Sequence, residues 1–140
     1  MNKDKVLQYK AFIKENLPEW RDLRDDEINI EKLSSLSNQV YKATALKEGL
    51  RRNPIIFRRF AIKEGVVDRL KEHKVFIELA RRNCGPHCYG GNNKYRLEEY
   101  FPARTIKNLE YNQVNIRRKL ARVLATLHKI DIPNIEKIPL

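Results

Sequence analysis

The chain has 140 residues, of which 41% are hydrophobic and 34% charged, enough for about one domain with a buried core. Its 29 Lys and Arg against 18 Asp and Glu give a formal net charge of +11, which raises nucleic acid, an acidic membrane or a phosphate ligand as partners. No apolar run approaches the ~20 residues that span a bilayer, and the charged first residues lack the apolar core of a secretion signal. Two cysteines exclude a disulfide scaffold and predict a reducing, cytoplasmic location.

The first third of the chain predicts a helix and a β-hairpin. Residues 4–16 place apolar side chains among charges at helical spacing, and Pro18 keeps that helix short. Apolar residues from position 28 and the β-branched and aromatic run 40–45 predict two strands. The small polar residues 33–38 between them predict a turn.

The middle of the chain predicts a strand followed by a helix. Gly49 and Pro54 mark a loop that leads into a third strand over residues 55–62. Residues 66–80 predict a helix with apolar residues on most of its faces, which is therefore buried on more than one side. The Gly-Pro pair at positions 85–86 ends it.

The last third predicts a second hairpin and a final helix. Residues 88–89 and 95–101 are the expected strands, with a Gly-Gly-Asn-Asn turn between them. Apolar residues at the i, i+4, i+7, i+8 spacing over 116–127 predict an amphipathic helix. The order of elements predicts an α+β fold, a five-stranded antiparallel sheet with packed helices.

Several site types find little support in the residues. Cys84, His87 and Cys88 lie within one tight turn, far in sequence from His73 and His128. Because a closed zinc site needs four ligands, a plain turn is the favoured interpretation. There is no Walker-type phosphate loop, and no histidine is followed two positions later by the aspartate of a kinase catalytic loop.

Nucleic-acid binding is also disfavoured. The basic clusters have no exposed aromatic residues between them and no recognition-helix pattern, so a solvated surface explains them better. These clusters lie on four different elements: Arg51-Arg52, Arg58-Arg59, Arg81-Arg82 and Arg117-Arg118-Lys119.

The order of the parts is more informative than any single motif. A small-residue turn, a strand with Arg58, a helix with Glu72 and a strand ending at residues 99–101 follow the order of a kinase amino-terminal lobe. In such a lobe, small residues let backbone N–H groups approach phosphate closely. On spacing alone, Arg58 and Glu72 are explained equally well as surface charges.

Several segments, in the right order, resemble the choline/ethanolamine kinase family, whose members have a protein-kinase-like fold. The similar segments are LPEWRDL at 17–23, LSN at 36–38 with Tyr41-Lys42, IFR at 56–58, VDR at 67–69 with Glu72 and Phe76, GPHCYG at 85–90, LEEYFP at 97–102 and LATLH at 124–128. The resemblance covers almost the whole chain.

The resemblance implies a nucleotide site. The turn would line the phosphates, Arg58 would bind phosphate, Glu72 would hold Arg58, and residues 99–104 would contact adenine and ribose. Ser34 and Ser35 stand where the family usually has two glycines, and each adds a Cβ beside the phosphates. The residues expected to bind nucleotide are Leu33, Ser34, Ser35, Leu36, Ser37, Asn38, Gln39, Arg58, Glu72, Glu99, Tyr100, Phe101, Pro102, Ala103 and Arg104.

The resemblance also implies that this chain is the ATP-binding amino-terminal lobe of such an enzyme, given as a fragment. The family's H-N-D-x-x-x-x-N base loop, its magnesium carboxylates and its choline pocket all align beyond residue 140, so no catalytic or metal-binding residue is expected here. We therefore expect ATP as partner, with Mg²⁺ and choline reached through the carboxy-terminal lobe, and no phosphoryl transfer by this chain alone. The expected parts are a lead-in segment (1–27), a nucleotide-binding lobe (28–106) and a linking helix with a tail (107–140).

Other assignments stay open at this point. Choline is preferred to ethanolamine because the segment 17–23 looks choline-type, whereas the segment 67–69 fits both groups. A non-catalytic module that binds nucleotide or a partner chain, including a second copy of itself, is the alternative from another class. Neither nucleic acid nor membrane insertion is expected.

Overall fold

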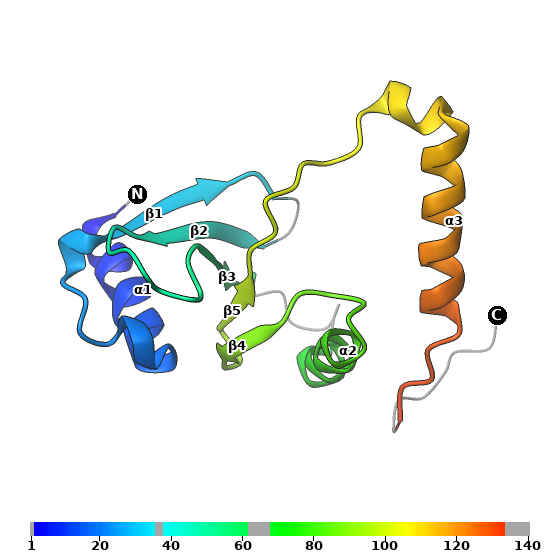
Figure 1. The fold of residues 1–140 in the computed structure, drawn as a ribbon. Coiled ribbons are helices and arrows are strands. Elements are labelled where there is room, and N and C mark those ends of the chain that lie inside the picture. Colours follow the sequence, from blue (N-terminus) through cyan, green and yellow to red (C-terminus); the bar gives the residue numbers. More distant parts are fainter. Residues whose placement is uncertain (1, 36–37, 62–67, 134–140) are drawn as a thin grey trace. The chain divides into compact units, whose positions relative to one another are not determined.

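A five-stranded antiparallel sheet, in the order β1-β2-β3-β5-β4, forms the centre of the first part of the chain (Figure 1). The computed structural model describes residues 2–35, 38–61 and 68–133. The chain divides into two units, Met1–Phe101 and Pro102–Leu140, and the sheet lies in the first. The predicted α+β class and five strands are confirmed: β1 (Ile28–Leu33), β2 (Gln39–Ala45), β3 (Ile55–Arg59), β4 (Cys88–Gly91) and β5 (Tyr95–Glu99).

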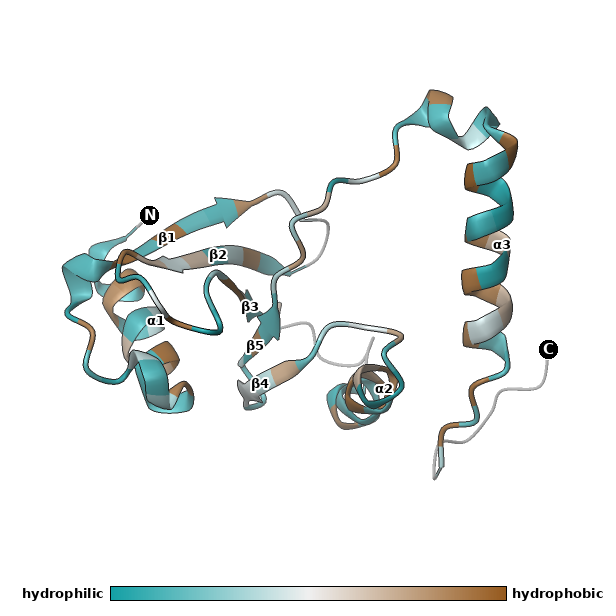
Figure 2. Ribbon diagram, in the orientation of Figure 1, coloured by the Kyte–Doolittle hydropathy of each residue, from teal (hydrophilic) through white to brown (hydrophobic). Residues whose placement is uncertain are grey.

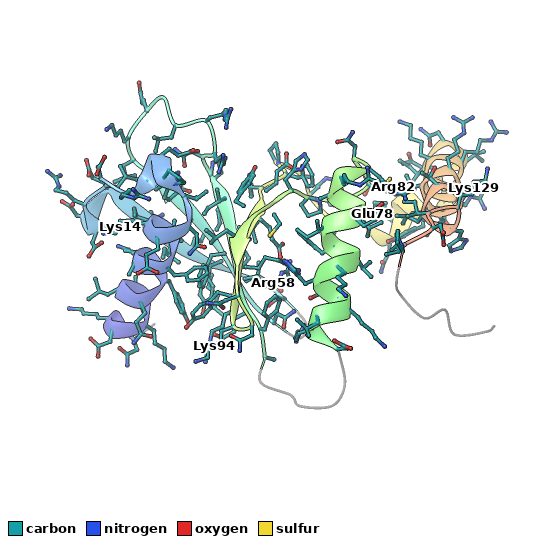
Figure 3. The ribbon with its side chains drawn as sticks, turned by 90° about the horizontal axis from the view of Figure 1, so that it is seen from below. Lys14, Arg58, Glu78, Arg82, Lys94 and Lys129 are labelled. Atoms are coloured by element: carbon teal, nitrogen blue, oxygen red, sulfur yellow. The ribbon has the colours of Figure 1, made fainter. Side chains whose placement is uncertain are left out.

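Helix α1 (Lys3–Asn16) supplies the core of this unit from one face of the sheet (Figure 3). Its Tyr9 ring lies 4.6 Å from the Phe57 ring of β3, centroid to centroid. Trp20, in the short 3-10 helix η1 (Pro18–Trp20), is fully buried, and its indole N–H donates to the carbonyl of Arg52 at 3.1 Å. Aromatic and aliphatic residues thus close this face to water.

Strand alternation gives the two faces of the sheet different chemistry. Ile55 and Phe57 are fully buried on the α1 side, so the residues between and beyond them, Ile56 and Arg58, point to the other side. Helix α2 (Arg69–Arg81) lies on that other side, and Figure 3 shows Arg58 between the sheet and α2. One face is therefore an apolar core and the other carries charge.

Helix α2 is confirmed, but the prediction that it is buried on more than one side is wrong. Leu70 is 77% exposed and Ile77 is 41% exposed, and Ala80 alone among its described residues is buried. The helix packs through one face, where the Phe76 ring covers the guanidinium of Arg96 at 3.8 Å. It begins at Asp68, whose carboxylate accepts hydrogen bonds from the first-turn backbone N–H groups. The predicted first residues 66–67 lie outside the described residues.

Two strands are shorter than predicted, whereas β4 is longer, because Gly90 and Gly91 of the predicted turn pair with Leu97 and Arg96 of β5. β3 ends at Arg59, and Phe60 leaves the strand while its N–H still bonds the carbonyl of Lys94 at 2.9 Å; position 62 lies outside the described residues. β5 ends at Glu99, opposite Ile55. The prediction that residues 100–101 continue β5 is wrong, because β3 offers no partner beyond Ile55.

The second unit contains the 3-10 helix η3 (Asn108–Asn112) and helix α3 (Val114–His128). The predicted amphipathic pattern of α3 is confirmed, and Figure 2 shows hydrophobic and hydrophilic residues alternating along it. Its apolar residues Leu120, Val123 and Leu124 are 36%, 56% and 45% exposed. No helix within the described ranges is long and apolar enough to cross a membrane.

Candidate functional site

Four charged side chains form a continuous ion cluster between β3, β5 and α2. The guanidinium of Arg58 donates two hydrogen bonds to Glu98, from Nε to Oε1 at 2.6 Å and from Nη2 to Oε2 at 2.9 Å. Arg96 donates from Nε to the same Oε1 at 2.8 Å and from Nη1 to Oε1 of Glu72 at 3.0 Å. The cluster therefore runs Arg58, Glu98, Arg96, Glu72.

Sheet register explains why these side chains meet. Arg58 lies opposite Arg96 in the β3–β5 ladder, and Glu98 follows Arg96 by two residues in β5. Side chains two apart in a strand share a face, and opposite residues lie about 4.5–5.5 Å apart at Cβ. All three therefore project toward α2, where Glu72 occupies the first turn of the helix.

The two middle residues of the cluster are buried, and both end residues are partly exposed. The side chains of Glu98 and Arg96 are 3% and 4% exposed, whereas those of Arg58 and Glu72 are 27% and 31% exposed. Burial raises the pKa of Glu98, but the hydrogen bonds and charges of Arg58 and Arg96 outweigh it and leave the pKa below its ordinary value. The hydrogen bond to Glu98 in turn raises the pKa of Arg58. Both groups are held charged.

The expected direct pair between Glu72 and Arg58 does not form. Within the described ranges, Glu72 bonds Arg96 while Arg58 bonds Glu98. The reason is that Arg96 lies between the helix and the sheet, against the Phe76 ring, and Glu98 is closer to Arg58 along the sheet. The Arg-x-Glu alternation in the β5 sequence, opposite Arg58, is the signal that could have revealed this arrangement.

The predicted phosphate turn lies at the same end of the sheet as Arg58. Val40 pairs with Arg58 in the β2–β3 register, so the residues just before Val40 adjoin it. The Asn38 side-chain oxygen accepts from the N–H of Ala61 at 3.1 Å, and that of Gln39 accepts from Arg59 at 2.9 Å. These bonds tie the turn to the end of β3.

Inside the turn itself, Leu33 is the last residue of β1, and Ser34 follows it. The Ser35 hydroxyl donates to the backbone carbonyl of Asn38. The expected phosphate-lining residues Leu36 and Ser37 lie outside the described residues.

The predicted adenine segment begins at the opposite end of β5. Glu99 pairs its backbone N–H with the carbonyl of His87 at 2.9 Å, and its carboxylate accepts from the His87 N–H at 3.1 Å. Tyr100 lies under the ammonium of Lys42, 5.0 Å from the ring centroid. Phe101 follows, 51% exposed.

The rest of that segment belongs to the second unit. Pro102 and Ala103 are exposed, and the guanidinium of Arg104 makes two bonds to Glu110, at 2.8 and 2.7 Å. These bonds lower the pKa of Glu110 to about 2. In this structure the Arg104 guanidinium is thus occupied by a carboxylate.

Sequence reasoning missed three residues on the α2-facing side of the sheet. Val40 and Ile56 are apolar neighbours of Arg58, and Lys42 lies opposite Ile56 in the register. The signal was the alternation of β2, in which Tyr41 is buried on the other face. These residues extend the candidate site from Arg58 toward Tyr100.

A metal site of the usual kind is absent from the described ranges. No group of three or more His, Cys, Asp or Glu side chains lies close enough to hold an ion.

Comparison with known proteins gives a consistent result. A sequence model of the family described as Choline/ethanolamine kinase matches residues 30–139. A human choline/ethanolamine kinase is 28% identical over 120 residues, covering 81% of this chain and 30% of the relative. Choline kinase A2 of Caenorhabditis elegans is 30% identical over 81 residues, covering 58% of this chain and 19% of the relative.

Two solved structures share the fold. A choline kinase from Cryptosporidium parvum superposes with a TM-score of 0.77 at 23% identity, over 93% of this chain and 38% of the other. An ethanolamine kinase from Plasmodium vivax gives 0.72 at 15% identity, over 94% and 35%. These likenesses confirm the predicted kinase-like lobe.

The chain spans about a third of the length of the relatives that match most of it. The family match nevertheless extends over well more than half of the chain, from β1 through α3. The chain therefore belongs to the choline/ethanolamine kinase family.

Proposed function

We propose that residues 28–106 are the nucleotide-binding part of a phosphotransferase that moves the γ-phosphoryl group of ATP to the hydroxyl of choline or ethanolamine. The observation that carries the proposal is the placement of Arg58. Its guanidinium is fixed by Glu98, partly exposed, and next to the predicted phosphate turn at one end of the sheet.

The sheet supports one orientation for the nucleotide. The predicted turn and Arg58 lie at the end of β3 near Arg59, and Glu99 pairs with Ile55 at the other end. Arg58 lies three residues after Ile55 in β3, a distance of about 10 Å along the strand. We propose that adenine binds near Tyr100 and that the phosphates extend along β3 to Arg58.

The chemical work of these residues is binding and charge stabilisation. Two of the Arg58 nitrogens bond Glu98, and Nη1 has no partner among the described residues. A phosphate oxygen would accept from Nη1, and a charge-assisted bond of this kind is about twice as strong as a neutral one. Phosphoryl transfer also requires magnesium and a base that positions the hydroxyl, which we expect from the part of the relatives that this chain does not span.

The proposed substrate rests on one sequence segment, and the proposed location rests on the two cysteines. The relatives include both choline and ethanolamine kinases by name, and the choline-type segment 17–23 is the reason for preferring choline. Cys84 and Cys88 are free thiols, which agrees with the cytoplasmic location that we propose.

Isothermal titration tests the nucleotide proposal. The chain should bind ATP more tightly than adenosine. Arg58→Gln should lower the ratio of the ATP affinity to the adenosine affinity about tenfold, because one charge-assisted hydrogen bond contributes roughly 1.5 kcal/mol or more. Equal affinity for ATP and adenosine in the unmodified chain would refute it.

A radiolabelled transfer assay tests whether this chain catalyses phosphoryl transfer by itself. The 140-residue chain with magnesium, ATP and choline should give no phosphocholine above background. Measurable product would show that these residues hold a complete active site.

A further inference from the structure

Arg96 is a buried charged residue that is held by contacts from two elements. It is 4% exposed and bonds two carboxylates from different elements, Glu98 of β5 and Glu72 of α2. Its guanidinium lies 3.8 Å from the Phe76 ring centroid and 5.2 Å from that of Phe60. An arginine fixed by two carboxylates and two rings has little freedom to reorient.

That constraint passes to Arg58 through a shared atom. Oε1 of Glu98 accepts from both arginines, at 2.6 Å from Arg58 and 2.8 Å from Arg96. If the bond from Arg96 is lost, one side of the Glu98 carboxylate is no longer fixed. The guanidinium of Arg58 would then lose its defined orientation without losing its charge.

Glu72 adds a link to the helix. Its Oε1 accepts from Arg96 at 3.0 Å, whereas its Oε2 is buried without a hydrogen-bond partner among the described residues. Buried carboxylate oxygens ordinarily have partners. Glu72 thus connects α2 to the cluster through Arg96 and retains one unused acceptor beside it.

We propose that Glu98 and Arg96 are positioning residues: Glu98 orients Arg58 toward the nucleotide phosphates from within the sheet, and Arg96 holds Glu98 in place and couples it to α2 through Glu72. The inference rests on the proposed function, because it concerns the same phosphate-binding cation. It assigns the orienting role to a strand carboxylate rather than to the helix carboxylate.

Charge-conserving variants separate geometry from electrostatics. Glu98→Asp keeps the negative charge but withdraws the carboxylate by one methylene, so it no longer reaches both Arg58 nitrogens. Arg96→Lys keeps the positive charge but lacks the planar fork that bonds two carboxylates at once. In both variants the net charge near the phosphates is unchanged.

A matched pair on α2 provides the control. Glu78 accepts two bonds from Arg81, at 3.0 and 2.8 Å, and one from Arg82 at 2.6 Å. This geometry is close to that around Glu98, but it lies outside the candidate site. Glu78→Asp and Arg81→Lys therefore make the same chemical changes where no effect on nucleotide binding is expected.

The experiment is isothermal titration of each variant with adenosine and with ATP plus magnesium. Glu98→Asp and Arg96→Lys should each lower the ATP-to-adenosine affinity ratio by about tenfold, equivalent to one charge-assisted bond, with adenosine binding within about twofold of the unmodified chain. A purely structural role would weaken both ligands equally, and this result would overturn the inference.

The outcomes distinguish the two proposals. If the ATP-to-adenosine affinity ratio falls in Arg58→Gln but not in Glu98→Asp or Arg96→Lys, the positioning role is overturned and the proposed function stands. If the unmodified chain binds ATP and adenosine with equal affinity, both proposals are overturned.

A measurement on the unmodified chain covers the case in which a variant fails to fold. In a nitrogen-edited NMR spectrum, ATP should shift the side-chain Nε–H signals of both Arg58 and Arg96, and adenosine should shift neither. A shift confined to Arg58 would show that Arg96 is not coupled to phosphate binding.

Discussion

Glu98 shows how one buried carboxylate links stability to the candidate site. It is 3% exposed and accepts three hydrogen bonds from two arginines. A buried ion pair contributes little net stability when it is complete, but it is strongly destabilising when one partner is removed. The ion cluster therefore fixes the orientation of Arg58 and adds little to the free energy of unfolding.

The lowered pKa of Glu98 gives a pH prediction. Its stabilising contribution is fully present above the ordinary pKa of 4.5 and is lost as the pH falls through the lower folded-state value. The difference in unfolding free energy between the unmodified chain and Glu98→Gln should therefore be largest above pH 5 and shrink toward pH 3, measured by urea denaturation.

The groups that face Glu98 are Arg58 on β3, Arg96 and, beyond it, Glu72 on α2, with Cys88 opposite on β4. Glu48→Gln, at an exposed loop position, is the control and should show no such trend. A difference for Glu98→Gln that stays constant from pH 7 to pH 3 would contradict the assigned pKa direction.

At the scale of elements, the α1 face of the sheet forms the apolar core and the α2 face carries the charged candidate site. Phe57 is fully buried, and its ring lies 4.6 Å from Tyr9 and 5.2 Å from Tyr95. Arg58, the next residue, points the other way. Packing by α1 therefore fixes the strand that carries Arg58, the proposed phosphate-binding residue.

This arrangement predicts a large cost for Phe57→Ala. The variant should lose about 3–5 kcal/mol of unfolding free energy, because it removes a buried ring and leaves a cavity. Leu7→Ala, on the same unit but at a half-exposed position, should change it by less than about 0.5 kcal/mol. Guanidinium chloride unfolding measures both, and similar losses for the two variants would contradict the described core.

The elements were predictable where local pattern determines them. The alternation of residues 40–45 predicted β2. The hairpin of β4 and β5 was predicted as well, although Gly90 and Gly91 of its expected turn belong to β4. The burial of α2 was not predictable in this way, because it depends on which partner the helix meets. Its apolar residues Leu70 and Ile77 are largely exposed although their spacing suggested burial.

The ion pairs of the site were less predictable for the same reason. Arg58 and Glu72 could be identified from their order in the chain, but their partners depend on the β3–β5 register. Arg96 lies opposite Arg58 only because β5, and not β4, is the neighbour of β3. Pairing between strands that are distant in the sequence cannot be predicted from the local spacing of residues.

For the whole molecule, the core predicts which part folds independently. Every buried residue of the core cluster lies between Tyr9 and Leu97. A chain ending at Phe101 should therefore keep cooperative thermal unfolding, with a midpoint within a few degrees of that of the full 140 residues. A non-cooperative transition in this shorter chain would show that residues after Phe101 are needed for the core.

The net charge of +11 is only partly explained by the candidate site. Arg58 is proposed to meet phosphate, and Arg96 and Arg104 are neutralised by carboxylates. The basic residues are spread over many elements, so the total charge alone does not indicate the ligand. Arg58 differs from the other basic residues in lying beside the predicted phosphate turn.

The proposed function requires that the α2-facing side of the sheet binds ATP with its phosphates at Arg58. Titration of ATP into the nitrogen-15-labelled chain, followed by backbone amide shifts, tests it most directly. ATP bound on this side of the sheet should shift the amide signals of Gln39, Arg58 and Tyr100, and leave those of Tyr9 and Ile13 inside the α1 face unchanged. Shifts centred on α1, or no shifts at millimolar ATP, would contradict it.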